Sequence, residues 1–255
     1  MKLGLYQGPP IQGDIETGFA RIEAQLSAAA MAGARMAVFP ELFLPGYNQP
    51  GLHSTLSQPQ GGDWCQRLSA LARKTGCGLT IGWAERDGDT VYNAATAFSP
   101  TGAVLGHYRK IQLYGPMEQA SFAFGDAYTV FNFMGRQCAL MICYDVEFAH
   151  HVKALADRGV TLLLVPTANP AGFEHVSTAI VPARASEHAM TIAYANFCGS
   201  EGALTFGGHS AIVGPDARAL AAAGTTETLL VTDIAKPYDP AFLSTQAADF
   251  RDAPA

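Results

Sequence analysis

The chain has 255 residues, of which 49% are hydrophobic and 15% charged, and its formal net charge is −6. This length and composition predict a globular protein with a substantial core, built as one large domain or two small ones. No run of basic residues is present, so the sequence argues against nucleic acid as a partner.

The N-terminus and the cysteines bear on the compartment in which the protein works. The first residues lack the apolar stretch of a signal peptide, and no run approaches the roughly 18 apolar residues of a membrane span. The five cysteines are an odd number, and Cys77, Cys138 and Cys143 lie in apolar, strand-like runs. Reduced thiols fit this pattern better than a disulfide framework, so we predict a cytoplasmic protein with no membrane partner.

The first half of the chain alternates apolar runs with amphipathic helices. Asp14 is placed to cap a helix whose residues Phe19, Ile22 and Leu26 share one face and which closes near Gly33. The other elements predicted here are a helix over 64–75, strands over 2–8, 35–41, 77–85, 91–99 and 103–110, and long loops over 45–62 and 111–127.

The second half continues this alternation with more strands. Because most strand-like runs are apolar on both faces, we expect sheets that are covered on both sides. Interspersed hairpins argue against a purely parallel, doubly wound sheet, and the absence of a composition break predicts one α/β domain. The predicted elements are helices over 147–158 and 174–189, and strands over 128–133, 136–145, 160–169, 191–196, 209–213, 218–221 and 228–233.

Four of the predicted strands end in a side chain that can take part in chemistry. Glu41, Lys110, Cys143 and Asn169 each follow an apolar run directly. Ligands of α/β proteins bind outside the carboxyl ends of strands, so these residues form a candidate site. A packed thiol at Cys143 and a structural ion pair between Glu41 and Lys110 would explain the same residues without catalysis. Residue spacing alone leaves these interpretations open.

Other well-known catalytic and ligand-binding motifs are missing from the sequence. It contains neither H-E-x-x-H nor a C-x-x-C pair, so a zinc site lacks ligands at the usual spacing. It contains no G-x-x-x-x-G-K, G-x-G-x-x-G or G-x-S-x-G pattern for nucleotide phosphates or a serine nucleophile. A Cys-His pair stays open, because the partners of such a pair need not be near each other in sequence.

Several segments, taken together, resemble the nitrilase, or carbon–nitrogen hydrolase, superfamily. Glu41, Lys110 and Cys143 stand in the catalytic order of that superfamily, and Glu118 stands where many members carry a second glutamate. A closer likeness, to bacterial aliphatic amidases of the 5-aminopentanamidase-like group, rests on LYQG (5–8), VPTAN (165–169) and YANFCGSE (194–201). The superfamily segments are FPELFLPGYN (39–48), YRKIQLYGPMEQASFAFGD (108–126), ICYDVEF (142–148) and GHSAIVGPD (208–216).

The resemblance implies a fold, a substrate class and a set of site residues. The implied fold is a single-domain, four-layer α-β-β-α sandwich over residues 1–240, followed by a C-terminal tail over 241–255. The implied partners are a small-molecule amide substrate and further copies of the chain, in a homodimer or higher homo-oligomer; no cofactor and no metal are implied. The implied catalytic residues are Glu41, Lys110, Cys143 and Glu118, with Tyr144 beside the thiol as a substrate-binding residue. Tyr47, in the loop after Glu41, and Asn169, at the end of the next strand, are substrate-binding candidates by position. A capping or loop-stabilising hydrogen bond is the alternative for both.

The implied reaction is hydrolysis of a small aliphatic primary amide, with ω-amino amides included, to carboxylate and ammonia. We expect Glu41 to take the thiol proton as Cys143 attacks the amide carbonyl and a thioester forms. Lys110 and the backbone N–H of Tyr144 are expected to stabilise the oxyanion, and Glu118 to position the substrate or water. The alternatives are an N-carbamoyl amine or a nitrile as substrate and, more distantly, a non-catalytic interaction module.

Four further polar residues near these motifs receive structural interpretations. Asp145 and Glu147 are expected to support the turn and helix start after the cysteine, without a catalytic role. Arg184 and Glu187, three residues apart on a predicted helix, are expected to form a structural or interface ion pair.

Overall fold

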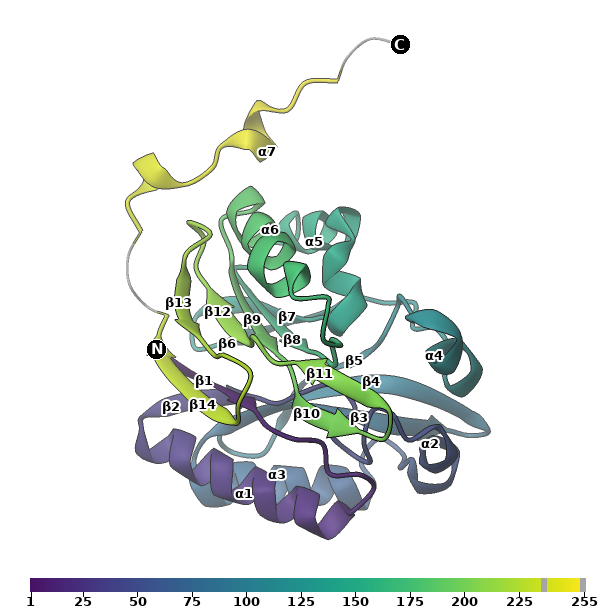
Figure 1. Ribbon diagram of the computed structural model, residues 1–255. Helices are drawn as coiled ribbons and strands as arrows, with labels where there is room; N and C mark the ends of the chain where they lie inside the picture. The colour runs from purple at the N-terminus through teal and green to yellow at the C-terminus, as the bar shows by residue number, and fades with distance from the viewer. Residues whose placement is uncertain (235–237, 253–255) are drawn as a thin grey trace.

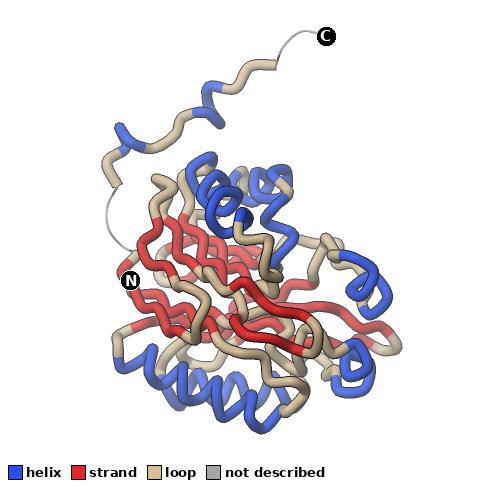
Figure 2. Tube along the Cα trace, viewed as in Figure 1, coloured by secondary structure: helices blue, strands red, loops and turns tan. Residues whose placement is uncertain are grey.

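Two six-stranded β-sheets lie face to face at the centre of the protein (Figures 1 and 2). This computed structural model describes residues 1–234 and 238–252. The first sheet has the order β14-β1-β2-β3-β4-β5, with bounds Thr228–Asp233, Lys2–Gln7, Ala34–Val38, Gly78–Asp87, Thr90–Phe98 and Val104–Arg109. The second has the order β13-β12-β9-β8-β7-β6, with bounds Ala219–Ala222, Ala211–Val213, Thr191–Ala195, Leu162–Pro166, Arg136–Leu140 and Thr129–Phe133.

Helices cover the outer face of each sheet, which gives four layers (Figure 1). On one side, α1 (Ile15–Met31) and α3 (Asp63–Thr75) pack on the first sheet. On the other, α5 (Ala149–Ala156), the π-helical turn η2 (Val176–Ile180) and α6 (Val181–Glu187) pack on the second. A third hydrophobic cluster fills the space between the two sheets. The predicted α-β-β-α sandwich is therefore confirmed, and both sheets mix parallel with antiparallel pairs.

The first helix shows how the sequence sets one of these layers. The Asp14 carboxylate accepts a hydrogen bond from the Thr17 N–H at 3.0 Å, which satisfies one of the free donors at the helix start. Phe19, Ile22 and Leu26 are all buried against the first sheet. Both the predicted cap and the predicted apolar face are confirmed.

The ends of parallel strands from both sheets meet in one region of the molecule. In the first sheet β2 runs parallel to β1 and β3, and in the second β8 runs parallel to β7 and β9. The segments after β2 and β8 are joined directly, because the Glu41 N–H donates to the Thr167 carbonyl at 3.2 Å. The residues that follow these strands therefore come together between the sheets, as expected for an α/β ligand site.

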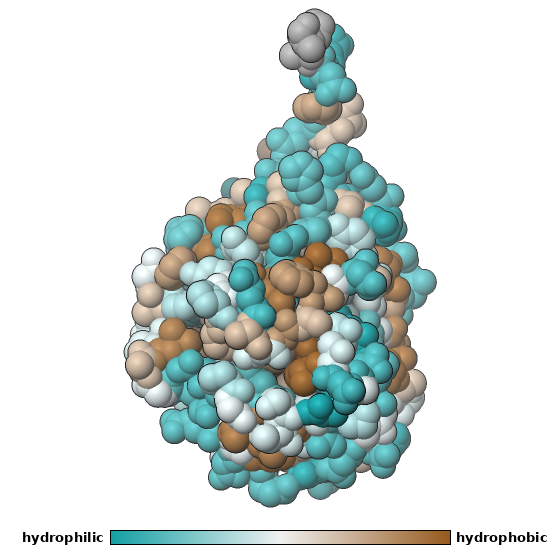
Figure 3. All heavy atoms as spheres, turned by 90° about the vertical axis from the view of Figure 1, so that its right-hand side faces the viewer, coloured by the Kyte–Doolittle hydropathy of each residue, from teal (hydrophilic) through white to brown (hydrophobic). Residues whose placement is uncertain are grey.

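Both predicted long loops contain a short helix. In 45–62 it is α2 (Pro50–Leu56), and in 111–127 it is α4 (Gly115–Ser121). Each has a proline in its first turn, where the fixed φ of proline suits a helix start, although the Pro and Gly content predicted loop. Figure 3 views the side that carries α2 and α4, and hydrophobic residues form patches there among hydrophilic ones. The hairpin of β10 (Cys198–Glu201) and β11 (Leu204–Gly207) was also not predicted.

The strand predicted over 136–145 ends earlier, at Leu140 of β7. The chain then enters a 3-10 helix, η1, over Cys143–Glu147. The reason is tertiary: the Asp145 carboxylate accepts hydrogen bonds from the N–H groups of Ile142 at 3.0 Å and Gln112 at 2.7 Å. These bonds turn the backbone out of the strand direction. The turn gives Cys143 a φ of 46°, in the left-handed region that residues other than glycine rarely occupy.

The C-terminal segment carries a short 3-10 helix, η3 (Pro240–Phe242), and α7 (Gln246–Asp249). Figure 1 shows it projecting from the body beyond α5 and α6. Residues 235–237 and 253–255 lie outside the described residues. The first range belongs to the predicted domain over 1–240, and the second to the predicted tail over 241–255. That division and the predicted homo-oligomer both stay predictions. In the described part of the chain, every helix is too short or too polar to cross a bilayer.

Candidate active site

The Glu41 carboxylate lies in a loop that follows β2 and that packs tightly against β3. A Cβ atom on Gly82 would come within 2.5 Å of the Glu41 Cα, so only glycine fits opposite it. The side-chain amide of Asn93 donates to Glu41 Oε1 at 2.7 Å. The other oxygen, Oε2, is buried and has no hydrogen-bond partner among the described residues. One face of this carboxylate is therefore held, and the other is unused.

Lys110 joins Glu41 to the second glutamate. Its Nζ donates to Glu41 Oε1 at 2.6 Å and to Glu118 Oε1 at 2.7 Å, and all three side chains are 0% exposed. Glu118 lies on α4 and is held further by the hydroxyl of Tyr47 at 2.7 Å and the N–H of Tyr114 at 3.0 Å. An ammonium has three donors, so Lys110 retains one proton that neither carboxylate accepts.

Cys143 begins η1, and its thiol opens into a cavity beside this charged group. Its backbone occupies the left-handed region, a conformation that persists only where surrounding contacts enforce it and that is frequent at active sites. The contacts come from Asp145, whose carboxylate also accepts the Tyr108 hydroxyl at 2.8 Å and is fully buried. Asp145 therefore supports the turn as predicted, and it does so through Ile142, Gln112 and Tyr108.

The charges of this group shift the pKa values of its members in different directions. Burial raises the Glu41 pKa to about 7; Lys110 opposes the rise and the Glu118 charge adds to it. Burial acts to lower the Lys110 pKa, but the Glu118 and Glu41 carboxylates outweigh it and raise that pKa. Burial and Glu41 raise the pKa of the Cys143 thiol well above its ordinary value, against the effect of Lys110. One ammonium shared by two carboxylates thus favours a neutral thiol beside a glutamate that titrates near neutral pH.

The thiol faces a cavity of about 240 Å³, a size suited to a small molecule. Its wall is largely aromatic and also carries one carboxylate and one imidazole. The lining residues are Tyr47, Tyr114, Cys143, Tyr144, Glu147, Ala168, Asn169, Pro170, Phe173 and His175.

The predicted substrate-binding residues all line this cavity, but in different ways. The Tyr47 ring is buried and its hydroxyl serves Glu118, whereas the Tyr144 side chain is half-buried. The amide of Asn169 donates to the Phe173 carbonyl at 2.8 Å, so its side chain stabilises the loop. That contact matches the loop-stabilising alternative that is common for asparagine near turns.

Other residues of the site carried no signal in the sequence. Asn93 holds Glu41 from the middle of β4, where its side chain has no motif around it. Phe173 and His175 lie in an irregular segment before η2, and nothing in their spacing points to the thiol. Of these three residues, only Asn93 leaves a sign in the sequence, as an asparagine within an apolar strand. Buried polar side chains require hydrogen-bond partners, so an asparagine there indicates a polar group nearby.

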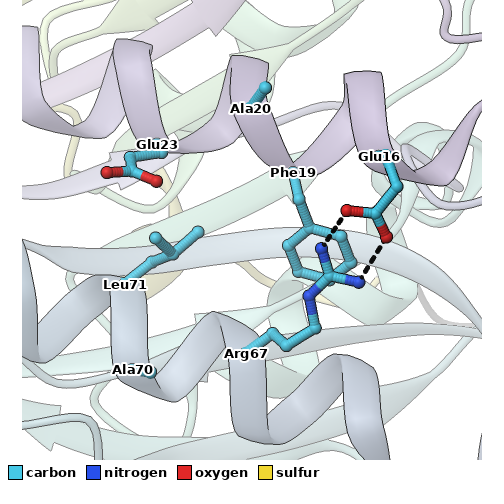
Figure 4. A pocket seen from close by; sticks show the side chains of 7 residues that line it. All are labelled: Glu16, Phe19, Ala20, Glu23, Arg67, Ala70 and Leu71. Atoms are coloured by element: carbon cyan, nitrogen blue, oxygen red, sulfur yellow. Dashed lines mark hydrogen bonds and ion pairs between the residues drawn. The ribbon is translucent and has the colours of Figure 1, made fainter.

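A second hollow, of about 380 Å³, lies between α1 and α3 on the surface (Figure 4). There the Arg67 guanidinium lies 3.6 Å from the centroid of the Phe19 ring and binds both Glu16 oxygens at 2.8 Å. These polar groups already satisfy one another, and no nucleophile lines the hollow. Its contents are those of a helix–helix contact, so the smaller cavity at Cys143 is the candidate active site.

Metal ligands are not gathered at either place. Within residues 1–234 and 238–252, no group of three His, Cys, Asp or Glu side chains is arranged to hold a metal ion. The five cysteines are free and buried.

Known proteins with similar sequences or structures are amidases and hydrolases. A "Hydrolase in pqqF 5'region" from Pseudomonas protegens is 36% identical, over 91% of this chain and 81% of that protein. An (R)-stereoselective amidase from Pseudomonas sp. is 29% identical, over 92% of this chain and 85% of that protein. The amidase from Nesterenkonia sp. AN1 has been solved as a mutant with acrylamide added at its active-site cysteine; it shares 36% identity and a TM-score of 0.88 over 98% of this chain and 97% of that one.

A mutant of the same Nesterenkonia amidase has been solved in complex with butyramide. The family model described as carbon–nitrogen hydrolase matches residues 2–238, which is nearly the whole chain. The resemblance predicted from the sequence motifs is confirmed at this level. The chain thus belongs to the carbon–nitrogen hydrolase family of the nitrilase superfamily, and it is an amidase that hydrolyses carbon–nitrogen bonds other than peptide bonds.

Proposed function

We propose that the protein hydrolyses small aliphatic primary amides, ω-amino amides among them, to carboxylate and ammonia through a cysteine thioester. The observation that carries this proposal is the single ammonium of Lys110 shared between Glu41 and Glu118 beside the Cys143 thiol. A structural ion pair needs one carboxylate. Two carboxylates that share one ammonium are not both fully neutralised, so one of these buried carboxyl groups can take up and release a proton.

The first step we propose is attack by Cys143 on the amide carbonyl. The unused Glu41 Oε2 takes the thiol proton as the carbon–sulfur bond forms, and negative charge develops on the carbonyl oxygen. The remaining proton of Lys110 and the backbone N–H of Tyr144 stabilise that oxyanion. Each such donor contributes about 3 to 4 kcal/mol to transition-state stabilisation in enzymes of this kind.

The second step returns the proton and releases ammonia. Glu41 gives its proton to the leaving nitrogen, the carbon–nitrogen bond breaks, and the acyl group stays on Cys143 as a thioester. A water molecule then attacks the thioester while a carboxylate takes its proton, and the thiol leaves with a proton restored. Glu118, fixed by Tyr47 and Lys110, is placed to position the substrate amide or that water.

Two further observations support small amides as substrates. The cavity of about 240 Å³ is at or below the lower end of the range for small-molecule sites. The similar amidase from Nesterenkonia sp. AN1 binds butyramide as a mutant and adds acrylamide at its active-site cysteine, and both molecules are short amides.

The test is ammonia release from compounds that share one four-carbon chain. The amide, the N-carbamoyl amine and the nitrile would be compared at equal concentration, with hydroxylamine added to trap a thioester as the hydroxamate. We expect the amide to be the best substrate and hydroxamate to form with it. A nitrile or carbamoyl compound that is turned over faster than the amide would overturn the substrate assignment. If no compound released ammonia and a thiol probe failed to label Cys143, the non-catalytic alternative would hold.

A further inference from the structure

The Glu147 side chain lines the cavity and does not do what the sequence predicted for it. We expected it to support the turn and helix start together with Asp145, but there the Asp145 carboxylate accepts the backbone N–H groups of Ile142 and Gln112 without it. Within the described residues, the Glu147 carboxylate accepts no hydrogen bond and forms no ion pair. The nearby Arg184 guanidinium donates to the Glu147 backbone carbonyl at 2.9 Å and pairs its other arm with Glu187, as predicted for that pair.

This carboxylate lies in surroundings that favour the arrival of a cation. Burial raises the Glu147 pKa, and the electrostatic effects of His175, Lys110 and Arg184 only partly offset that rise. A half-buried carboxylate without a direct partner is stabilised when an ammonium binds to it, because charge-assisted hydrogen bonds are the strong ones. An anionic group entering the cavity would instead be repelled by Glu147 and by the group of Lys110, Glu41 and Glu118, in which two carboxylates share one ammonium.

The aromatic rings beside Glu147 suit the same ligand chemistry. The ring centroid of Tyr114 lies 5.2 Å from that of Tyr144 and 6.4 Å from that of Phe173, and all three rings line the cavity. Aromatic faces attract ammonium groups through the ring quadrupole, most strongly where water is displaced. A carboxylate next to several aromatic rings is therefore a surface that recognises an alkylammonium.

The spacing along η1 indicates how long the substrate should be. Glu147 is the last residue of η1 and Cys143 the first, so their Cα atoms are separated by about 8 Å along the helix at 2.0 Å per residue. In an extended amide the five bonds from carbonyl carbon to a terminal nitrogen span about 6 Å, since a chain advances about 1.2 Å per bond. The difference is within the reach of the glutamate side chain.

We propose that Glu147 is a specificity-determining residue that binds the terminal ammonium of an ω-amino amide about five carbons long, against the rings of Tyr114, Tyr144 and Phe173. The inference rests on the proposed function, because it assigns the far end of the substrate whose amide is held at Cys143. It goes beyond that function by naming the group that discriminates between cationic, neutral and anionic amides. Glu147 acts on the substrate and takes no part in the chemical steps.

The experiment compares three amides of equal length on the wild-type chain and on Glu147→Gln. They are 5-aminopentanamide, hexanamide and the monoamide of adipate, which place an ammonium, a methyl group or a carboxylate at the same distance. We expect the wild type to prefer the cationic amide over hexanamide by about 10-fold in kcat/KM, as for a hydrogen bond to a charged group. Glu147→Gln should lose that preference, leave hexanamide within about twofold, and improve the anionic amide.

The control variant is Asp157→Asn, which removes one negative charge from the C-cap of α5, at an exposed pair with Lys153 outside the cavity. It should leave all three kcat/KM values unchanged.

A second measurement serves if Glu147→Gln folds poorly: pentylammonium should inhibit hexanamide hydrolysis by the wild type and inhibit Glu147→Asp more weakly. Equal losses on hexanamide and 5-aminopentanamide, or a wild type that prefers hexanamide, would overturn the inference while leaving amide hydrolysis intact. A wild type inactive on all three amides would instead overturn the proposed function, and this inference with it.

Discussion

Two buried glutamates, Glu41 in the loop after β2 and Glu85 on β3, are held in opposite ways. Both are at most 1% exposed, and each is paired with a cation from the end of β5. The Arg109 guanidinium donates to both Glu85 carboxylate oxygens, at 2.7 and 2.8 Å, and the His107 ring is hydrogen-bonded to Glu85 at 2.9 Å. Lys110 and Asn93 both donate hydrogen bonds to Glu41 Oε1, and Glu41 Oε2 has no hydrogen-bond partner among the described residues.

The electrostatic result of the two arrangements differs accordingly. Burial alone would raise the Glu85 pKa, but the hydrogen bonds from His107 and Arg109 outweigh it and lower that pKa to about 2. Burial raises the Glu41 pKa to about 7, because Lys110, which is shared with Glu118, opposes the rise only in part and the Glu118 charge adds to it. A fully satisfied buried ion pair fixes structure, whereas a partly satisfied one near neutral pKa can move a proton. The sequence left open whether Glu41 and Lys110 form an ion pair or a catalytic site. The structure shows the ion pair and leaves one Glu41 oxygen without a hydrogen-bond partner among the described residues.

The largest effect should come from removing the thiol. Cys143→Ala should abolish ammonia release, by about 10⁴-fold or more, because no other group can form the thioester. The fold should persist, since η1 is held by Asp145 and not by the thiol. Cys138→Ala is the matched control: it truncates a fully buried cysteine of β7, lowers the melting temperature, and keeps full activity per folded molecule. Ordinary activity in Cys143→Ala would disprove the mechanism.

The next effect tests the comparison itself by the same substitution at both glutamates. Glu41→Gln should reduce kcat/KM by about 10² to 10⁴-fold through loss of the general base, with no loss of stability. Glu85→Gln should leave kcat/KM within a few fold and lower the free energy of unfolding by about 2 to 3 kcal/mol, because it leaves Arg109 and His107 short of an acceptor. Urea unfolding and ammonia release would be measured on both. The opposite assignment of losses would show that satisfaction of the carboxylate does not separate the two roles.

The sequence predicted the layered fold and the family for identifiable reasons, whereas the catalytic roles of Glu41, Lys110 and Cys143 stay predictions. The helix capped by Asp14 depends on contacts within a few residues, and local patterns record such contacts. The candidate grouping of Glu41, Lys110 and Cys143 came from their positions after predicted strands, and their catalytic order came from the resemblance. Residues 102 and 33 apart in numbering carry no local sign of contact. What was missed depends on long-range contacts: β7 ends early because Asp145 binds Gln112, and Asn93 reaches Glu41 across the sheet.

Removal of the second carboxylate should sharpen the comparison further. Glu118→Gln leaves Lys110 with Glu41 as its one charged partner, so Glu41 no longer shares its cation with a second buried carboxylate. The Glu41 pKa should fall, because the Glu118 charge that raises it is gone. We expect a loss of about 10²-fold in kcat/KM, together with a shift of the acid limb of the pH–rate profile to lower pH. Tyr47→Phe keeps the Glu118 charge, so it should lose less activity and leave the limb in place. Full activity in Glu118→Gln would assign Glu118 a structural role.

The smallest effect is the pH dependence of the wild type. Glu41 must be ionised to accept the thiol proton, so kcat/KM should fall about tenfold per unit as pH falls below the Glu41 pKa of about 7. Below pH 6 the fall should steepen, because burial raises the Asp145 pKa to about 6 and protonation there weakens the bonds that shape η1. The position of this acid limb depends on the neighbours of Glu41 as well, since the Lys110 and Glu118 charges both act on the Glu41 pKa.

Glu85 supplies the internal reference for that pH profile. Its pKa is lowered from 4.5 to about 2, so the stability that it contributes is complete above about pH 4.5 and is lost only as pH falls toward 2. The loss of activity between pH 8 and 6 should therefore occur in a chain that circular dichroism shows to be fully folded. If unfolding accompanied the loss of activity in that range, the limb would report stability, and the distinction between the two glutamates would fail.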